Sequence, residues 1–182
     1  MILTKKQRGI IADYEQLAAP SKVDVDRLPA DTTARTINLL LTYHWWIRGA
    51  VIMKYTLMDE YLAAIIANYY FGKPRDGHYG KLWRRKKFQL FNHHVLDELF
   101  LLKKKEIVHQ IKPLPKDINS KIQAINDVRN ALAHSFFPEN RRRYYKKGGV
   151  LYDGLDLFTT SGIEKFLNDT QDVIDVLHKR AV

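Results

Sequence analysis

Apolar residues recur at helical spacing through much of the chain. Between residues 116 and 135 they advance by four, three, three and four positions, which is the 3.6-residue period of a helix with one buried face. A second stripe of this kind follows SGIE at 161–164, an expected capping box that opens the last helix. The first stripe comprises Ile118, Ile122, Ile125, Val128 and Leu132, and the second Ile163, Phe166, Val173, Ile174 and Leu177.

Three further helices are expected upstream of these two. Residues 34–71 have helical spacing with a break expected near Gly49, and GKP at 72–74 stops this segment. Residues 81–91 and 95–111 give the other two helices. Residues 1–33, with a short helix near Gly9–Ala18, form an N-terminal lead-in to a single helical domain over 34–182.

A small β-hairpin is expected before the last helix. VLYDGLDLF at 150–158 alternates apolar and polar residues around an Asp-Gly pair, which favours a tight hairpin turn. The predicted fold is therefore all-α, an antiparallel helical bundle with a small β-hairpin insertion. The apolar region 37–71 is interrupted by charges and never reaches about 18 uninterrupted apolar residues, so no membrane span is expected.

Positive charge is concentrated in the middle of the chain. The net charge is +10, and residues 72–147 hold 19 Lys and Arg against 7 Asp and Glu. Such a field attracts polyanions through phosphate neutralisation, although a solvated Lys-rich surface has the same composition. The absence of cysteine excludes disulfides, thiolate metal sites and a cysteine nucleophile, and it fits a cytoplasmic protein.

The sequence RNALAHS at 129–135 places three chemically active side chains within six residues of one helix. Asn130 and His134 are four residues apart and share a face, whereas Arg129 lies about 140° from His134 on an ideal helix. Arginine offers a charged fork suited to phosphate, histidine exchanges a proton near neutral pH, and Asn130 can orient either. By spacing alone, an ordinary helix-end histidine and an arginine paired with a carboxylate remain an alternative.

In its full context, INDVRNALAHSF resembles the signature of the HEPN superfamily (higher eukaryotes and prokaryotes nucleotide-binding). That signature is an arginine, a polar residue, three to five further residues and a histidine near the end of a bundle helix. LMDEYLAAIIANYYF at 57–71 resembles the family's early helix, whose carboxylate often contacts the motif arginine. Here Asp59 and Glu60 are both candidates, and Glu60 is favoured. The resemblance implies a HEPN-like bundle over about residues 35–180.

The resemblance implies a metal-independent endoribonuclease that needs no cofactor. In such enzymes the ribose 2′-hydroxyl attacks the adjacent phosphorus at a site composed of two protomers, so a homodimer is implied. His134 is the expected general base or acid, Arg129 stabilises the phosphorane, Asn130 orients the pair, and Ser135 supports them. The family also implies a toxin or defence effector with a possible antitoxin partner, such as a nucleotidyltransferase. Phe136 departs from the pattern, since some family toxins carry a modifiable tyrosine there.

Two basic and aromatic segments are candidates for RNA binding. The first lies between Trp83 and Phe88, where a solvated helix face is the alternative, and the second follows the motif as a possible cleft rim. Their residues are Arg84, Arg85 and Lys86, and Arg141, Arg142, Arg143, Tyr144 and Tyr145. YHWWIRGAVIMKY at 43–55 is expected in the core or at a dimer interface. His93, His94 and His109 lack ligand spacing, so no metal site is expected. The principal alternative function is a catalytically inactive HEPN-like scaffold that binds RNA or protein.

Overall fold

The computed structural model describes residues 32–73, 80–133 and 149–182. Helices dominate these residues, which confirms the all-α class. The expected lead-in helix lies outside them. The chain divides between His44 and Trp45 into two units, and every contact described below lies within the second. In chain order the elements are α2 (Thr32–Phe71), α3 (Gly80–Trp83), α4 (Lys86–Phe91), the π-helical η3 (Asn92–Leu96), α5 (Leu101–Ile111), α6 (Lys116–Ala133), β1 (Leu151–Tyr152), β2 (Leu155–Asp156) and α8 (Thr160–Ala181).

Helix α2 runs for 40 residues without the break expected near Gly49, so that prediction was wrong. A glycine inside a helix costs about 0.5–1 kcal/mol relative to alanine. Burial on either side offsets this cost, because Ile47 and Val51 are completely buried. The helix ends at Phe71, as predicted, where Gly72 adopts a φ of +79° and its amide donates to a carbonyl of the last turn. This is a glycine C-terminal cap.

The helix expected at 81–91 is broken in two. Arg85 is extended, with φ −89° and ψ 117°, and it separates α3 from α4. No glycine or proline marks this break. Aromatic packing accounts for it, because the ring of Phe88 makes edge contacts with Trp83 and Phe71 at centroid distances of 5.1 and 5.3 Å. The turn thus brings α4 against the end of α2.

The helix expected at 95–111 begins later than predicted. Asn92–Leu96 form a π-helical turn, and Phe100 is extended with φ −65° and ψ 152°. Helix α5 therefore starts at Leu101, which is buried. It ends at Ile111, as expected.

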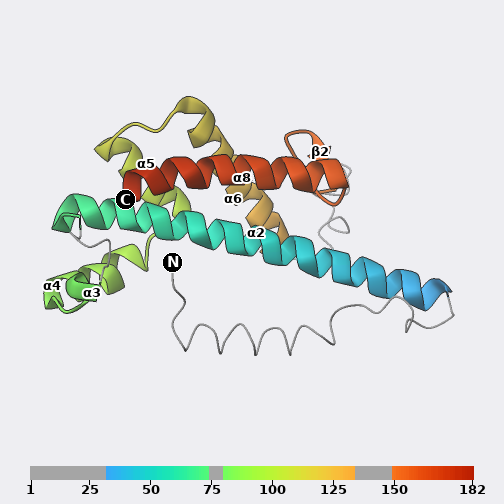
Figure 1. The fold of residues 1–182 in the computed structure, drawn as a ribbon, viewed down its shortest axis with the longest axis horizontal. Helices are drawn as coiled ribbons and strands as arrows, with labels where there is room; N and C mark the ends of the chain where they lie inside the picture. Colours follow the sequence, from blue (N-terminus) through green and yellow to red (C-terminus); the bar gives the residue numbers. More distant parts are fainter. Residues whose placement is uncertain (1–31, 74–79, 134–148) are drawn as a thin grey trace, which may run out of the picture. The chain divides into compact units, whose positions relative to one another are not determined.

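Helices α2, α6 and α8 pack together along their buried faces (Figure 1). The apolar stripes predicted for α6 and α8 are both buried, so these predictions are confirmed. Side-chain contacts fix the direction of α6 against α2. Tyr55 reaches Asn126, whereas Arg48, earlier in α2, reaches Leu132, later in α6. The two helices are therefore antiparallel.

Helix α8 runs in the same direction as α2. Lys54 Nζ donates to Gln171 at 2.6 Å, and Asn68 Nδ2 donates to the carbonyl of Ala181 at 2.6 Å. Figure 1 shows both helices progressing toward the same end. The antiparallel packing expected of the bundle is thus observed between α2 and α6, while α2 and α8 run parallel. Two helices that each run antiparallel to a common neighbour must run parallel to each other.

The predicted β-hairpin is confirmed. Leu151 pairs with Asp156 and Tyr152 with Leu155 in an antiparallel register. The turn residues Asp153 and Gly154 have φ values of 50° and 80°. Positive φ at both central positions is the requirement of a type I′ turn, which suits the right-handed twist of the two strands.

The start of α8 lies two residues before the expected capping box. Thr159, rather than Ser161, is the N-cap, and its hydroxyl accepts from the amide of Gly162 at 3.2 Å. The same hydroxyl donates to the carbonyl of Asp156 at 2.7 Å. This second bond ties the helix start to the hairpin, which explains why the cap falls on Thr159.

Two glycine-to-alanine substitutions should have opposite effects on stability. A Cβ at Gly162 would lie 1.9 Å from the carbonyl oxygen of Asp156, whereas a Cβ at Gly49 meets nothing within 4 Å. Gly162→Ala must displace backbone and should lower the free energy of unfolding by about 2 kcal/mol or more. Gly49→Ala should raise it by about 0.5–1 kcal/mol. Urea unfolding checks both, and equal effects would contradict the close approach at Gly162.

A buried carboxylate fastens the hairpin to α8 and α6. Asp169 is 7% exposed, accepts from Tyr152 Oη at 3.2 Å, and pairs with Lys121 at 2.9 Å and Lys165 at 2.5 Å. Burial raises the pKa of Asp169, but the hydrogen bonds from both lysines outweigh burial and hold that pKa below its ordinary value. Burial beside this carboxylate raises the pKa of the Tyr152 phenol well above its usual range.

The depressed pKa of Asp169 predicts a stabilisation that acid removes. Because the folded pKa lies below the unfolded value of about 3.9, the stabilisation is present above that pH and is lost as pH falls through the folded pKa. Asp169→Asn should lower the free energy of unfolding at pH 7 by about 2 kcal/mol and have a smaller effect at pH 3. Urea unfolding of the variant and wild type at both pH values measures this. An unchanged difference at pH 3 would contradict the assignment, and the exposed Asp172→Asn serves as control.

Candidate active site

Arg129 and Asn130 lie in the last turn of α6, half-buried, beside α2. The other residues expected at the motif, His134 and Ser135, follow directly in the sequence and lie outside the described residues. The second segment predicted to bind RNA also lies outside them; it comprises Arg141, Arg142, Arg143, Tyr144 and Tyr145. The described part of the motif is therefore its Arg–Asn pair.

Two neighbours hold the guanidinium of Arg129. Its Cζ lies 5.0 Å from the centre of the Tyr55 ring, and its Nη1 donates to Asn130 Oδ1 at 3.1 Å. Its Nε is buried without a hydrogen-bond partner among the described residues. An aromatic face attracts a cation without neutralising its formal charge. The guanidinium is thus positioned while its positive charge remains available to an anion.

Tyr55 connects this arginine to the helix core. Its hydroxyl donates to Asn126 Oδ1 at 3.4 Å. Burial raises the pKa of Tyr55, the charge of Arg129 opposes the rise, and Asp59 adds to it. The phenol therefore stays protonated at neutral pH and acts as a donor. In the sequence Tyr55 looked like one more aromatic of the 43–55 segment, and no local pattern marked it as a neighbour of the motif.

Arg48 brings a second arginine to the end of α6. Its Nη1 donates to the carbonyl of Leu132 at 2.6 Å. Carbonyls in the last turn of a helix have no partner within the helix, and a cation there is favoured by the helix dipole. Leu132 precedes His134 by two residues. From the sequence Arg48 was only an interruption of an apolar stretch, 81 residues before Arg129.

Neither expected carboxylate forms an ion pair with Arg129 in the described structure. Asp59 Oδ2 instead lies 2.6 Å from Nζ of Lys104, a buried lysine of α5. Glu60 is exposed and lines a pocket together with Trp83 and Phe88 rather than contacting Arg129. The favoured Glu60–Arg129 contact is therefore not observed. Adjacent helical residues point about 100° apart. Asp59 therefore faces α5 and Glu60 does not.

The pairing of Asp59 with Lys104 affects the charge of the site. Each of these two charges is balanced by the other across α2 and α5. The Arg129 guanidinium is left without a carboxylate partner among the residues that the structure describes. A positioned guanidinium that is half-buried and carries uncompensated charge is suited to binding a phosphate oxygen.

The first segment predicted to bind RNA lies at the junction of α3 and α4. Arg84, Arg85 and Lys86 are all exposed there. Their neighbours Trp83 and Phe88 line the same pocket as Glu60. These cations therefore adjoin that pocket, and no contact between them and Arg129 is found in the described residues.

The histidines of the described residues have structural contacts. His109 Nδ1 accepts from the amide of Leu114 at 3.1 Å, which fastens the end of α5 to the following turn. His93 and His94 lie ring against ring at 4.7 Å on η3. Within residues 32–73, 80–133 and 149–182, no cluster of three or more His, Asp or Glu side chains could hold a metal ion. Over the same residues no helix is both long enough and apolar enough to cross a membrane.

Comparison with known proteins gave no match: no family model, no curated protein and no solved structure is similar to this chain. A function for the chain is therefore inferred from its own residues and contacts.

Proposed function

We propose that this protein is a metal-independent endoribonuclease of the HEPN type. The observation that carries the proposal is the state of Arg129, held over the Tyr55 ring and by Asn130 while no described carboxylate neutralises it. The resemblance of RNALAHS to the family signature supplies the matching histidine, His134, four residues after Asn130. RNA cleavage requires a cation that binds the phosphate and a side chain that transfers a proton, and Arg129 and His134 are of these two types.

The proposed reaction is an internal transesterification. A base removes the proton of the ribose 2′-hydroxyl, whose oxygen then forms a bond to the adjacent phosphorus. The bond between phosphorus and the 5′-oxygen breaks, and an acid protonates that oxygen. The products are a 2′,3′-cyclic phosphate and a 5′-hydroxyl. Arg129 stabilises the charge of the phosphorane, Asn130 keeps the guanidinium oriented, and His134 transfers a proton.

Two protons move in this reaction, and one histidine does not serve both at once. A second copy of the chain supplies a second His134, which is the chemical reason for proposing a homodimer. The 43–55 segment, expected in the core or at an interface, contains both buried and exposed apolar residues. Ile47 and Val51 are completely buried, whereas Trp45 and Met53 are 66% and 63% exposed.

Five exposed apolar residues between Trp45 and Leu57 lie along one side of α2. We call this stripe the outer face of α2; it consists of Trp45, Trp46, Ile52, Met53 and Leu57. On an ideal helix Ile52 lies about 40° from Arg48 and about 60° from Tyr55. Met53, within the outer face, lies about 160° from Tyr55. A second copy bound at the Ile52 edge of the outer face would therefore adjoin the α6 end of each protomer. Large exposed apolar patches commonly mark such interfaces.

The biological setting that we propose follows from the resemblance. A nuclease of this kind acts as a toxin or defence effector and requires an antitoxin or other regulator to keep it silent. The cationic surface residues near Trp83 fit an RNA substrate.

A catalytically inactive scaffold that binds RNA or protein is the second candidate. It is favoured by Tyr55 and Arg48, whose contacts with α6 also serve packing. Binding without cleavage distinguishes it from the nuclease.

The proposal is tested by incubating the purified full chain with an RNA and with a DNA of the same sequence, both in EDTA. Cleavage of the RNA alone is expected, since DNA lacks the 2′-hydroxyl. Arg129→Ala should reduce this cleavage by about 10²-fold or more, and Arg180→Ala, which removes an arginine bound to the carbonyls of Lys112 and Pro113, is the control. A requirement for a divalent metal would contradict the mechanism. RNA binding without cleavage would favour the scaffold.

A further inference from the structure

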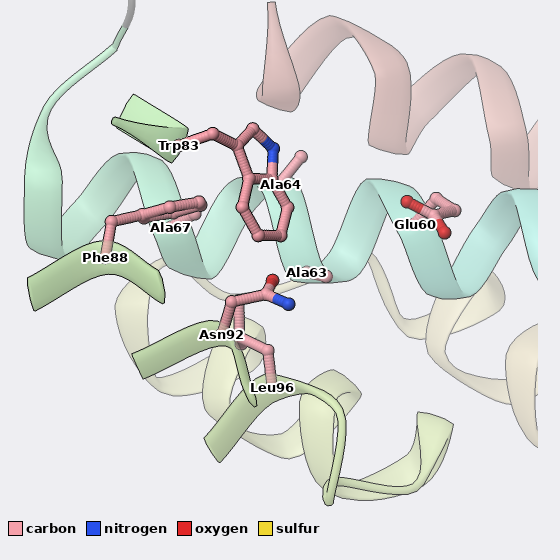
Figure 2. Close-up of a pocket in the computed structure, with 8 residues that line it drawn as sticks. All are labelled: Glu60, Ala63, Ala64, Ala67, Trp83, Phe88, Asn92 and Leu96. Carbon is pink, nitrogen blue, oxygen red and sulfur yellow. The ribbon is translucent and has the colours of Figure 1, made fainter. Parts of the chain in front are cut away.

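A pocket opens between α2 and the segment α3–η3. Its volume is about 140 Å³, and its lining residues are Glu60, Ala63, Ala64, Ala67, Trp83, Phe88, Asn92 and Leu96 (Figure 2). A cavity of about 150 Å³ is sufficient for a benzene-sized ring. The pocket therefore has room for one six-membered planar ring.

The walls of the pocket suit a flat aromatic ligand. Three alanines of α2 form one side and leave space because they carry only a methyl group. Trp83 is 47% exposed, and its ring is held by an edge contact with Phe88 at 5.1 Å. Figure 2 shows the Trp83 ring standing beside Ala64 and Ala67. A base can stack on such a fixed and accessible ring.

Apart from the Trp83 indole N–H, the pocket offers two acceptors, on Glu60 and Asn92. Glu60 has no hydrogen-bond or ion-pair partner among the described residues, so its carboxylate can accept. Asn92 Nδ2 donates to both carboxylate oxygens of Asp97 at 3.1 Å, which leaves its Oδ1 as an acceptor. In Figure 2 the Asn92 amide lies below the Trp83 ring and points toward Ala63. A ligand that satisfies both groups must present several N–H donors on one edge.

The π-helical turn η3 supplies two of the lining residues, Asn92 and Leu96. Single π-helical turns are rare and occur frequently at functional sites. The Asn92 amide and the Leu96 side chain of this turn both line the pocket.

The charge around the pocket selects the class of ligand. Arg84, Arg85, Lys86 and Lys87 are all exposed next to Trp83. An aromatic ring with a carboxylate could also hold an organic cation, but four adjacent cations repel a positively charged ligand. The same four residues attract a phosphate. A nucleotide matches both features, because its planar base fits the pocket and its anionic phosphate fits the adjacent cations.

We propose that this pocket is a nucleobase subsite selective for guanine. Guanine presents N1–H and N2–H₂ on one edge, which a carboxylate can accept as a pair, whereas adenine and cytosine present one amino group and uracil one N–H. Trp83 stacks on the base, Glu60 and Asn92 accept from its edge, and the Arg84–Lys87 cations bind its phosphate. The proposal rests on the proposed function only in identifying RNA as the source of the base.

Isothermal titration of the full chain with GMP, AMP, CMP and UMP tests the subsite without requiring catalysis. GMP should bind at least about tenfold more tightly than the other three. Glu60→Gln should remove that preference. Ala64→Leu, which fills the pocket, should abolish the preference, and Ala124→Leu, at a half-buried alanine of α6, should preserve it. His134→Ala should bind GMP like wild type.

Other outcomes would overturn the subsite or separate it from the proposed nuclease. Equal binding of all four nucleotides, unaffected by Glu60→Gln or Ala64→Leu, would mean that the cations bind phosphate and no base is selected. Binding of tetramethylammonium in place of GMP would identify a cation pocket. Selective GMP binding together with uncut RNA would contradict the proposed nuclease activity but support the guanine subsite. RNA cleavage without selective GMP binding would contradict the guanine subsite and leave the proposed nuclease activity standing.

Discussion

His134→Ala should reduce RNA cleavage by about 10²–10⁴-fold, the range of general acid–base catalysis, while the protein stays folded and retains RNA binding. The proton transfer assigned to this residue has no substitute among the described side chains near Arg129, where Asn130 does not titrate and Tyr55 stays protonated. Cleavage rates measured under single-turnover conditions, with thermal unfolding as a check on folding, give the result.

A matched variant separates catalysis from surface effects. His94→Ala removes an exposed histidine of η3 that contacts only His93 among the described rings. It should cut RNA at the wild-type rate. Equal cleavage rates for His134→Ala and wild type would show that this histidine does not transfer a proton in the reaction, and would favour the scaffold.

Met53→Glu should convert the proposed homodimer into monomers and lower cleavage in parallel. Met53 is 63% exposed on the outer face of α2, so the substitution leaves the core of one protomer unchanged. A charge buried without a partner at an apolar interface costs several kcal/mol, and two copies would meet there. Light scattering on a sizing column measures the mass, which for one chain is 21.3 kDa.

The control is Phe100→Glu, which places the same charge at an apolar residue that is 82% exposed before α5. It should remain dimeric and active. A Met53→Glu protein that stays dimeric would place the interface elsewhere. A wild-type protein that is monomeric and fully active would contradict the composite site.

The sequence predicted those elements that are fixed by local chemistry. The stripes of α6 and α8 are buried because a 3.6-residue period presents one face to a neighbour whatever that neighbour is. The hairpin turn at Asp153–Gly154 and the end of α2 at Gly72 were predictable because positive φ strongly favours particular residues. These features require no knowledge of the rest of the chain.

Features that depend on distant contacts were missed or misplaced. The break at Arg85 has no glycine or proline to mark it and results from aromatic packing between α4 and the end of α2. The continuity of α2 through Gly49 depends on burial of its neighbours. Burial at those positions is decided by helices that lie far along the chain.

In the candidate site, too, residues in a local motif were predicted and residues brought in by distant contacts were not. The Arg129–Asn130 pair was found because it belongs to a compact motif. Its neighbours Tyr55 and Arg48 were not, since they come from a helix more than 70 residues earlier. The choice between Asp59 and Glu60 depended on which neighbour each faces, and the structure pairs Asp59 with Lys104.

Cleavage of an RNA that carries one 2′-deoxynucleotide tests the central claim most directly. The cleavage position is first mapped in EDTA with unmodified RNA, and the nucleotide on its 5′ side is then replaced by its 2′-deoxy form. The proposed mechanism predicts that unmodified RNA yields a 2′,3′-cyclic phosphate and a 5′-hydroxyl, and that the single substitution abolishes cleavage at that position. Cleavage that continues there, or ends that carry a 5′-phosphate, would contradict attack by the 2′-hydroxyl.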